Sequence, residues 1–353
     1  MSTRVRSYCK INLGLAVGPA RPDGFHALST VYQTIQLHDF VTVTAHRATE
    51  TIIQITSNHR GVPRTEANSA ERNTAFRMVQ KTLDRLNLTA NVQIHIEKTL
   101  PVQGGMGAGS ANAAAATLGL ERELGVALPG PARLEVAAEV GSDVPLFLLG
   151  GTVLGLNRGE EVYPLPDPPP LHCVVALPEI GVSTALAFQQ LDAGRLTSGP
   201  SVDKLKQLSR ALASVWSTTG VESGPSGIAF MDRIGLIPSD LSSDRASEMR
   251  DVSGDLAENP LLALVRTGIE NDFEEVVFSQ HPSLRSTKRE LVGSDPGAAI
   301  FACLSGSGSA LFGLYASQTD ARAAQQRVLE AGTQAILTET LPRSAYWDTM
   351  FAE

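Results

Sequence analysis

A glycine-rich loop at residues 101–110 restricts the fold of this chain more than any other feature. It reads PVQGGMGAGS, with glycines at positions 104, 105, 107 and 109. Glycine tolerates positive φ angles and lets a ligand approach the main chain closely. The alternating segment 92–97 before the loop predicts a strand, and the alanine-rich segment 110–124 after it predicts a helix. A strand, a glycine loop and a helix N-terminus together predict a cradle for phosphate groups.

Two common phosphate-binding patterns do not describe this loop. The Walker A pattern requires Gly-Lys-Ser/Thr, and no lysine follows these glycines. A dinucleotide-binding loop follows the first strand of a βαβ unit and precedes an acidic residue on the next strand, and neither condition is met here. A plain glycine connector is the alternative, but four glycines in six positions before a polar helix start argue against it. The loop therefore predicts an anion site of another kind.

A proline-rich break divides the chain into two parts. Residues 164–170 read PLPDPPP, and proline neither donates a backbone hydrogen bond nor continues a helix or central strand. We therefore expect an N-terminal domain at 1–165 and a C-terminal domain at 166–353. Before the break we predict strands at 3–8, 12–17, 27–37, 40–44, 51–56, 92–97, 146–156 and 161–165, and helices from 68–73 to 86, at 110–124 and at 132–140.

The part after the break has a mixed pattern and one long polar stretch. Residues 217–254 are rich in Ser, Gly and Asp, which is typical of a surface excursion. We predict strands at 172–177, 299–304, 310–315 and 334–340, and helices at 184–191, 202–216, 260–278, 284–292 and 319–331.

The composition excludes several classes of protein. The chain has 353 residues, 42% of them hydrophobic, and a net charge of −8. An acidic chain without a basic block is a poor candidate for binding nucleic acid or an anionic membrane surface. No apolar run reaches the ~18 residues that span a bilayer. The cysteines at 9, 173 and 303 lie far apart and are odd in number, so we expect a reducing, cytoplasmic setting.

Two charged residues are candidates for catalysis. Asp143 stands in GSDVP before an apolar run, where it is either a helix N-cap, the commoner outcome, or a partly desolvated base. Lys10 lies between apolar neighbours in the first predicted strands. It either extends its ammonium to solvent at a sheet edge or faces a carboxylate or phosphate. Asn12, two positions on, points to the same side of the strand.

Two further segments each allow two interpretations. Phe25 and His26 follow a turn signal and are either surface residues or a stacking platform for a flat ligand. The Gly/Ser segment 304–309 connects two predicted strands. It is either a plain hairpin or a second wall of the phosphate site.

Several segments, taken together, resemble motifs of the GHMP kinase superfamily, which includes galactokinase, homoserine kinase, mevalonate kinase and phosphomevalonate kinase. They are CKINL at 9–13, RPDGFH at 21–26, the glycine loop, GSDVP at 141–145, NDFE at 271–274 and LSGSG at 304–308. The resemblance runs from about residue 7 to about residue 316. RPDGFH is the specific motif, because most members of the superfamily lack it. It is similar to the branch that phosphorylates the 2-hydroxyl of a cytidine diphosphate alcohol, 4-diphosphocytidyl-2-C-methyl-D-erythritol, in the non-mevalonate isoprenoid pathway.

The resemblance implies a fold and a division of roles. The fold is α+β, with an N-terminal domain like the second domain of ribosomal S5 and a ferredoxin-like C-terminal domain. Asp143 would be the general base and Lys10 would orient the hydroxyl, which Asn12 contacts. The substrate's cytosine would be held by Phe25, His26, Thr184 and Phe188. ATP phosphates would lie on Gly104, Gly105, Met106, Gly107, Ala108, Gly109 and Ser110.

The resemblance also implies the cofactor and the partners. Mg²⁺ would be held through ATP, with Ser110 as a candidate contact and no separate metal site in the protein. The partner would be the small-molecule substrate, for a monomer or a homodimer. Gln103, Ala108 and Ala111 depart from the family's glycine loop, Cys9 replaces its usual Ala, and the segment 194–259 is longer than usual.

Two alternatives stay open at this point. One is a superfamily kinase for mevalonate or homoserine, against which the Phe25–His26 platform speaks. The other is a catalytically silent sensor. Such a protein usually loses the base or the loop, whereas Lys10, Asp143 and Ser110 are all present.

Overall fold

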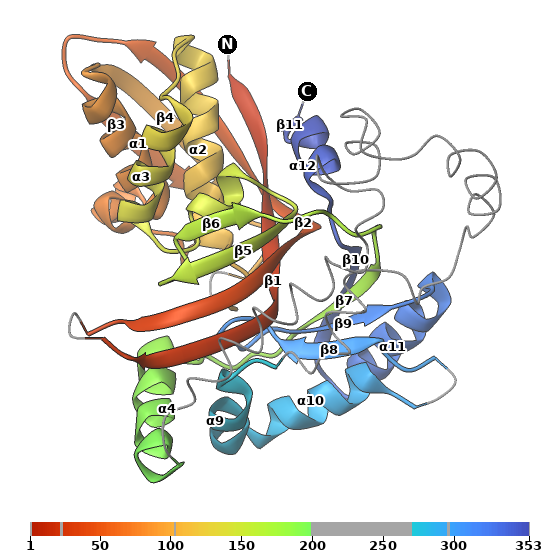
Figure 1. Ribbon diagram of the computed structural model, residues 1–353. Coiled ribbons are helices and arrows are strands. Elements are labelled where there is room, and N and C mark those ends of the chain that lie inside the picture. The colour runs from red at the N-terminus through yellow and green to blue at the C-terminus, as the bar shows by residue number, and fades with distance from the viewer. Residues whose placement is uncertain (1, 22–23, 102–103, 199–269, 295–296, 353) are drawn as a thin grey trace, which may run out of the picture. The chain divides into compact units, whose positions relative to one another are not determined.

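The computed structural model in Figure 1 contains two β-sheets with helices packed on each. It describes residues 2–21, 24–101, 104–198, 270–294 and 297–352. These residues lie within one compact unit, formed by residues 1–201 together with 270–353. The predicted helix 202–216, the start of the predicted helix 260–278 and the polar stretch 217–254 lie outside the described residues, as do Asp23 and Gln103.

The larger sheet contains seven strands and carries the N-terminal motifs. Its strands are β1 (Thr3–Ala20), β2 (His26–Arg47), β3 (Ile52–Ser57), β4 (Ala90–Glu97), β5 (Thr152–Asn157), β6 (Glu161–Pro164) and β11 (Phe351–Ala352). The order is β11-β1-β2-β4-β3, and β5 pairs with both β2 and β6. The β3–β4 pair is parallel and the other pairs are antiparallel.

The first two strands form one long hairpin. We predicted strands at 3–8 and 12–17, but β1 is continuous, and β2 likewise joins the predicted strands 27–37 and 40–44. The register shifts between Tyr8 and Lys10 and again between Asn12 and Gly14. Such irregularities interrupt the alternation that marks a strand in a sequence. The sequence therefore predicted two separate strands where the structure has one continuous strand with register shifts.

Helices cover one face of this sheet (Figure 1). They are α1 (Thr74–Leu86), α2 (Ala108–Leu124) and α3 (Gly130–Val140), and two short 3₁₀ helices, η1 (Thr65–Ala67) and η2 (Ala70–Arg72), precede α1. Asn73 caps α1 by accepting a hydrogen bond from the Ala75 N–H. The alanines of α2 are buried, and their small side chains let this helix lie close on β1 and β2.

The segment after Asp143 differs from its prediction. We predicted a strand at 146–156, but Pro145–Leu148 forms the 3₁₀ helix η3 and β5 begins only at Thr152. A short apolar run does not distinguish a buried strand from a buried helical turn. Proline is well suited to the first turn of a helix, and the four residues of η3 are fully packed in the core.

The smaller sheet is antiparallel, in the order β10-β7-β9-β8. Its strands are β7 (His172–Leu177), β8 (Phe301–Leu304), β9 (Leu311–Tyr315) and β10 (Gln334–Glu339). The helices of this part are α4 (Thr184–Ser198), α9 (Phe273–Gln280), α10 (Pro282–Val292) and α11 (Gln318–Glu330). Helices α10 and α11 pack on the sheet. The predicted boundary at residue 165 stays a prediction.

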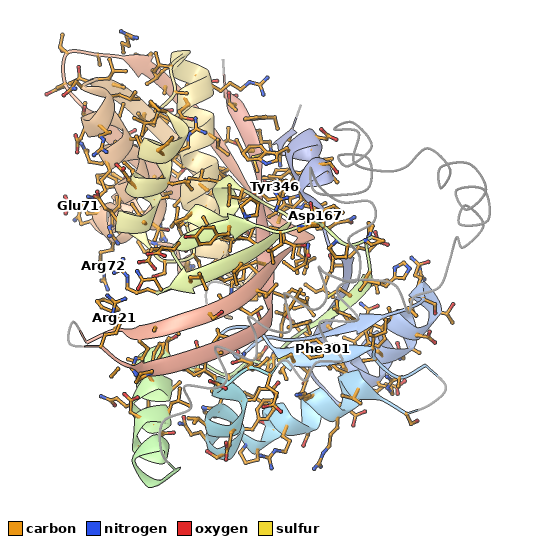
Figure 2. The ribbon with its side chains drawn as sticks, in the orientation of Figure 1. Arg21, Glu71, Arg72, Asp167, Phe301 and Tyr346 are labelled. Atoms are coloured by element: carbon orange, nitrogen blue, oxygen red, sulfur yellow. The ribbon has the colours of Figure 1, made fainter. Side chains whose placement is uncertain are left out.

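The chain returns to the larger sheet at its C-terminal end, which the sequence did not predict. Helix α12 (Arg343–Thr349) leads into β11, which pairs with β1. Figure 2 labels Tyr346 and Asp167, two residues that attach α12. The Tyr346 hydroxyl donates to the Phe147 carbonyl oxygen over 2.6 Å, and the Asp167 carboxylate accepts the Arg343 N–H over 2.8 Å. Helix α12 therefore contacts η3 directly, through the Tyr346–Phe147 hydrogen bond.

Among the residues that the structure describes, no helix is both long and apolar enough to cross a membrane.

The packing of α2 on the larger sheet gives a stability prediction. A Cβ atom at Gly119 would lie 2.7 Å from Val43 Cγ2, so we expect Gly119→Val to lower the free energy of unfolding by about 1–3 kcal/mol. Gly130, exposed at the start of α3, has no atom within 4 Å of such a Cβ. Gly130→Val is the control, and urea unfolding of both variants is the measurement. Equal stabilities would contradict the packing described for α2.

Candidate active site

Three side chains from distant segments meet at the start of the glycine loop. The Lys10 ammonium on β1 lies 3.7 Å from Asp143 Oδ2, and the Tyr32 hydroxyl on β2 donates to Asp143 Oδ1 over 3.1 Å. The Lys10 side chain is 3% exposed, whereas that of Asp143 is 32% exposed. The N-cap of η3 is Val144, so the helix-cap interpretation of Asp143 is wrong. The carboxylate instead faces a buried cation and stays accessible to a ligand.

The Lys10 ammonium has two further partners. It donates to Asn12 Oδ1 over 2.5 Å and to the Gly105 carbonyl oxygen over 2.6 Å. Burial lowers the pKa of Lys10, and the nearby Asp143 charge acts in the opposite direction. The interpretation of Lys10 as a solvent-seeking edge residue is therefore wrong. Asn12 also donates to Thr30 Oγ1 over 2.8 Å, so its amide is held at both ends.

The glycine loop depends on two positive φ angles. Gly105 and Gly107 have φ of +74° and +68°. A Cβ atom on Gly107 would lie 2.9 Å from Phe147 Cζ and 3.3 Å from Lys10 Cε. Gly107 is also the N-cap of α2, so the unpaired N–H groups of the first helical turn follow it directly.

A cavity of about 700 Å³ opens beside this loop. Its walls come from four parts of the chain: Thr74 at the start of α1, Pro101 with residues 104–110 of the loop, residues 181–184 leading into α4, and residues 307–308. The predicted phosphate-loop residues Gly104, Gly105, Met106, Gly107, Ala108, Gly109 and Ser110 all line it, and so does Thr184. The Thr184 and Ser307 hydroxyls lie 2.7 Å apart. By contrast, Ala111 packs in the hydrophobic core.

The Gly/Ser segment 304–309 is both a connection and a wall. It joins β8 to β9, and the Ser305 hydroxyl donates to the Gly105 carbonyl oxygen over 3.0 Å. The buried Asn271 amide holds the segment by donating to the Leu304 and Gly306 carbonyl oxygens, over 2.8 and 2.7 Å. The segment is therefore the connection between β8 and β9, and it also supports the glycine loop from the smaller sheet. Its role as a wall of a phosphate site stays a prediction.

A cluster of aromatic side chains, here called the aromatic cluster, lies where β1 ends and β2 begins. The rings of His26 and Phe188 stack, with centroids 4.7 Å apart, and Phe273 meets Phe188 edge-on at 4.9 Å. His26 Nε2 lies 2.8 Å from Asp192 Oδ1 on α4. Phe25 is 51% exposed, and the Arg158 guanidinium lies 5.0 Å above its ring.

The structure brings most of the predicted site residues together. Lys10, Asn12 and Asp143 form one contact group with Gly105, and His26 forms another with Phe188. Sequence reasoning missed Tyr32 and Asp192, which contact Asp143 and His26. Their partners are 111 and 166 residues away in the chain, and no local pattern marks such pairs. Among the described residues, no group of three or more His, Cys, Asp or Glu side chains is arranged to hold a metal ion.

The comparisons with known proteins identify a family. The profile of the GHMP kinases N terminal domain matches residues 73–151, and that of the GHMP kinases C terminal region matches residues 255–334. A Solibacter usitatus protein named 4-diphosphocytidyl-2-C-methyl-D-erythritol kinase is 35% identical over 88% of this chain and 80% of its own length. A protein of the same name from Corynebacterium glutamicum strain R is 33% identical over 99% of this chain and 96% of its own.

Solved structures share the fold. A crystal structure of 4-(cytidine 5'-diphospho)-2C-methyl-D-erythritol kinase has a TM-score of 0.62 at 24% identity, over 96% of this chain and 98% of that chain. A homoserine kinase from Cytophaga hutchinsonii also has a TM-score of 0.62, at 20% identity, over 97% of this chain and 95% of that chain. The chain belongs to the GHMP kinases, and within them to the family of 4-diphosphocytidyl-2-C-methyl-D-erythritol kinases. The predicted fold class is confirmed.

The buried ammonium gives a prediction for the pH dependence of activity. Lys10 is charged below its pKa and neutral above it, and burial lowers that pKa. We therefore expect the rate of phosphoryl transfer to fall on the alkaline side before pH reaches the ordinary lysine range of about 10.4. Burial raises the pKa of the neighbouring Cys9 thiol to about 12 and that of Tyr32 well above its usual value, so both lose their protons later.

The measurement is kcat against pH, with ¹⁵N NMR of the lysine side-chain amines followed over the same range. A fall in kcat at alkaline pH that coincides with the Lys10 titration supports a role for the charged Lys10 ammonium in phosphoryl transfer. A Lys10 ammonium that stays protonated through the fall in kcat would contradict it.

Proposed function

We propose that this chain transfers the γ-phosphoryl group of ATP to the 2-hydroxyl of 4-diphosphocytidyl-2-C-methyl-D-erythritol, in the non-mevalonate pathway of isoprenoid synthesis. The relatives at 35% and 33% identity are named 4-diphosphocytidyl-2-C-methyl-D-erythritol kinase, which supports this substrate. The observation that carries the proposal is the Lys10–Asp143 pair, which lies directly against the glycine loop. A carboxylate, a buried cation and a phosphate cradle together are what an alcohol kinase requires.

In this mechanism Asp143 accepts the proton of the attacking hydroxyl. Its carboxylate is exposed enough to reach a substrate, and a general base must lie within hydrogen-bond distance of the proton that it removes. Lys10, whose ammonium lies 3.7 Å from Asp143 Oδ2, supplies a positive charge beside the reacting oxygen. Asn12 orients the Lys10 ammonium through its amide oxygen. The Asn12 amide accepts from Lys10 and donates to Thr30. We therefore assign Asn12 this orienting role, in addition to the contact with the substrate hydroxyl that the resemblance implies.

The glycine loop is the proposed site for the ATP phosphates. The free N–H groups at the start of α2 and the backbone of residues 104–110 favour an anion there. Gly107 lets the loop pack closely on Phe147 and Lys10, since a Cβ there would lie 2.9 Å from Phe147 Cζ. Mg²⁺ bound together with ATP would supply positive charge that offsets the negative charge of the phosphates. Ser110 lines the cavity and is the proposed protein contact nearest to that ion.

The aromatic cluster of His26, Phe188 and Phe273 is the proposed site for the cytosine. His26 and Phe188 already stack on each other at 4.7 Å, so a base would stack on an outer face of this pair. Phe25, with Arg158 over its ring, offers a second flat surface on the same hairpin. Thr184, at the N-terminus of the helix that carries Phe188, would close the site from the cavity side.

The proposal includes an organisation and a setting. The site would form between an N-terminal domain, 1–165, and a C-terminal domain, 166–353, in a cytoplasmic protein that is a monomer or a homodimer. All three cysteines are free thiols and buried, which is compatible with a reducing compartment.

Substrate choice cannot come from the fold, because a homoserine kinase matches it with the same TM-score as the cytidine-dependent enzyme. The test is ATP consumption with Mg²⁺ and, in parallel, 4-diphosphocytidyl-2-C-methyl-D-erythritol, mevalonate or homoserine. We expect turnover with the cytidine compound alone. Turnover with another alcohol would overturn the proposed substrate, and binding without turnover on any of them would favour a sensor.

The proposed base gives a second test. Asp143→Asn keeps the shape of the side chain but cannot accept the proton, so kcat should fall by about 10²–10⁴. The melting temperature should stay close to that of the unmodified protein, because Lys10 keeps its hydrogen bonds to Asn12 and Gly105 and the Asn oxygen can still accept from Tyr32. Asp84→Asn, in which only an exposed bond within α1 is altered, is the matched control. A full kcat in Asp143→Asn would remove Asp143 from the mechanism.

A further inference from the structure

We propose that Tyr32 is a positioning residue that fixes the carboxylate of Asp143 for catalysis, an inference that rests on the proposed function. Tyr32 lies in the first third of β2, directly opposite Asn12 on β1 and Val153 on β5. Its hydroxyl donates to Asp143 Oδ1 over 3.1 Å, while Asp143 Oδ2 faces the Lys10 ammonium at 3.7 Å. The two carboxylate oxygens are therefore held by different strands of the same hairpin.

The Tyr32 ring also contacts the ammonium. Lys10 Nζ lies 5.7 Å from the ring centroid, within the range in which an aromatic face attracts a cation. Tyr32 thus touches both members of the proposed catalytic pair, one through its hydroxyl and the other through its ring. Because the distance between Lys10 and Asp143 exceeds that of a normal hydrogen bond, the bond from Tyr32 defines the orientation of the carboxylate.

The space for this ring is built into the sheet. A Cβ atom on Gly155 of β5 would lie 2.5 Å from Tyr32 Cε2, and one on Gly159, in the β5–β6 turn, would lie 2.5 Å from the Tyr32 hydroxyl oxygen. Gly159 has φ of +100°, which other residues rarely adopt. The two glycines leave the ring only this place, with 2% of the residue exposed. The tyrosine is therefore fixed before any ligand binds.

The hydroxyl stays a donor over the working pH range. Burial raises the pKa of Tyr32 well above its usual value, and the negative charges of Asp143 and Glu160 raise it further. Lys10 is the cation that faces the same carboxylate. With Tyr32 on Oδ1 and Lys10 near Oδ2, the carboxylate keeps further lone pairs. Its side chain is 32% exposed, so a hydroxyl can approach them.

The test compares Tyr32→Phe with the unmodified protein. Phenylalanine keeps the ring and removes only the hydroxyl, so KM for both substrates should change by less than about twofold. A hydrogen bond to a charged group is worth enough that kcat should fall about 10- to 100-fold. Tyr315→Phe is the matched control: its buried hydroxyl donates to the Leu291 carbonyl oxygen over 2.7 Å, in the smaller sheet. That variant should lose some stability and keep its kcat.

A double-mutant cycle separates positioning from a general structural effect. If Tyr32 acts through Asp143, Tyr32→Phe should change the residual kcat of Asp143→Asn by less than about twofold. The same fall in both backgrounds, or an unchanged kcat in Tyr32→Phe alone, would overturn the inference.

Crystal structures of the unmodified protein and Tyr32→Phe give a readout that does not depend on the substrate. The inference predicts that the Asp143 carboxylate rotates or loses order in the variant. An unchanged, ordered carboxylate would overturn it, even if the protein phosphorylates another alcohol or none. Failure of the proposed function would show separately, as absent turnover of the cytidine compound by the unmodified protein.

Discussion

A charged ammonium almost entirely removed from water is the constraint on which the site depends. Removing an ion from water costs several kcal/mol unless partners replace the lost hydration. Lys10 finds these partners in Asn12 on its own strand, in the Gly105 carbonyl of the glycine loop and in Asp143 before η3. Each partner comes from a different segment of the chain. The partners that offset the burial of the Lys10 charge therefore hold β1, the glycine loop and the segment of Asp143 together.

The two glycine-containing loops meet at the same carbonyl group. The Gly105 oxygen accepts hydrogen bonds from Lys10 and Ser305, and a Cβ on Gly105 would lie only 2.1 Å from the Ser305 carbonyl oxygen. Backbone contact this close requires glycine. The buried Asn271 amide then ties the second loop to the start of α9. The net charge of −8 does not oppose anionic ligands at such a place, because local amides and a nearby cation act over shorter distances.

The sequence predicted the elements whose signals are local. The alternation at 92–97 and the alanines of α2 were sufficient for β4 and for that helix, since each pattern lies within one element. The continuous β1 was missed because bulges hide its alternation, and η3 was missed because a short apolar run fits a strand as well. Tyr32 was out of reach for another reason: in a strand it is one more aromatic core residue, and only the fold brings Asp143 to its hydroxyl.

The most direct test of the site is a crystal structure with a non-hydrolysable ATP analogue, Mg²⁺ and 4-diphosphocytidyl-2-C-methyl-D-erythritol bound together. We predict that the phosphates lie on the backbone of residues 104–110 and that the substrate's 2-hydroxyl lies within about 2.6–3.2 Å of an Asp143 carboxylate oxygen. Phosphates bound away from the glycine loop, or a 2-hydroxyl directed away from Asp143, would contradict the assignment of this site.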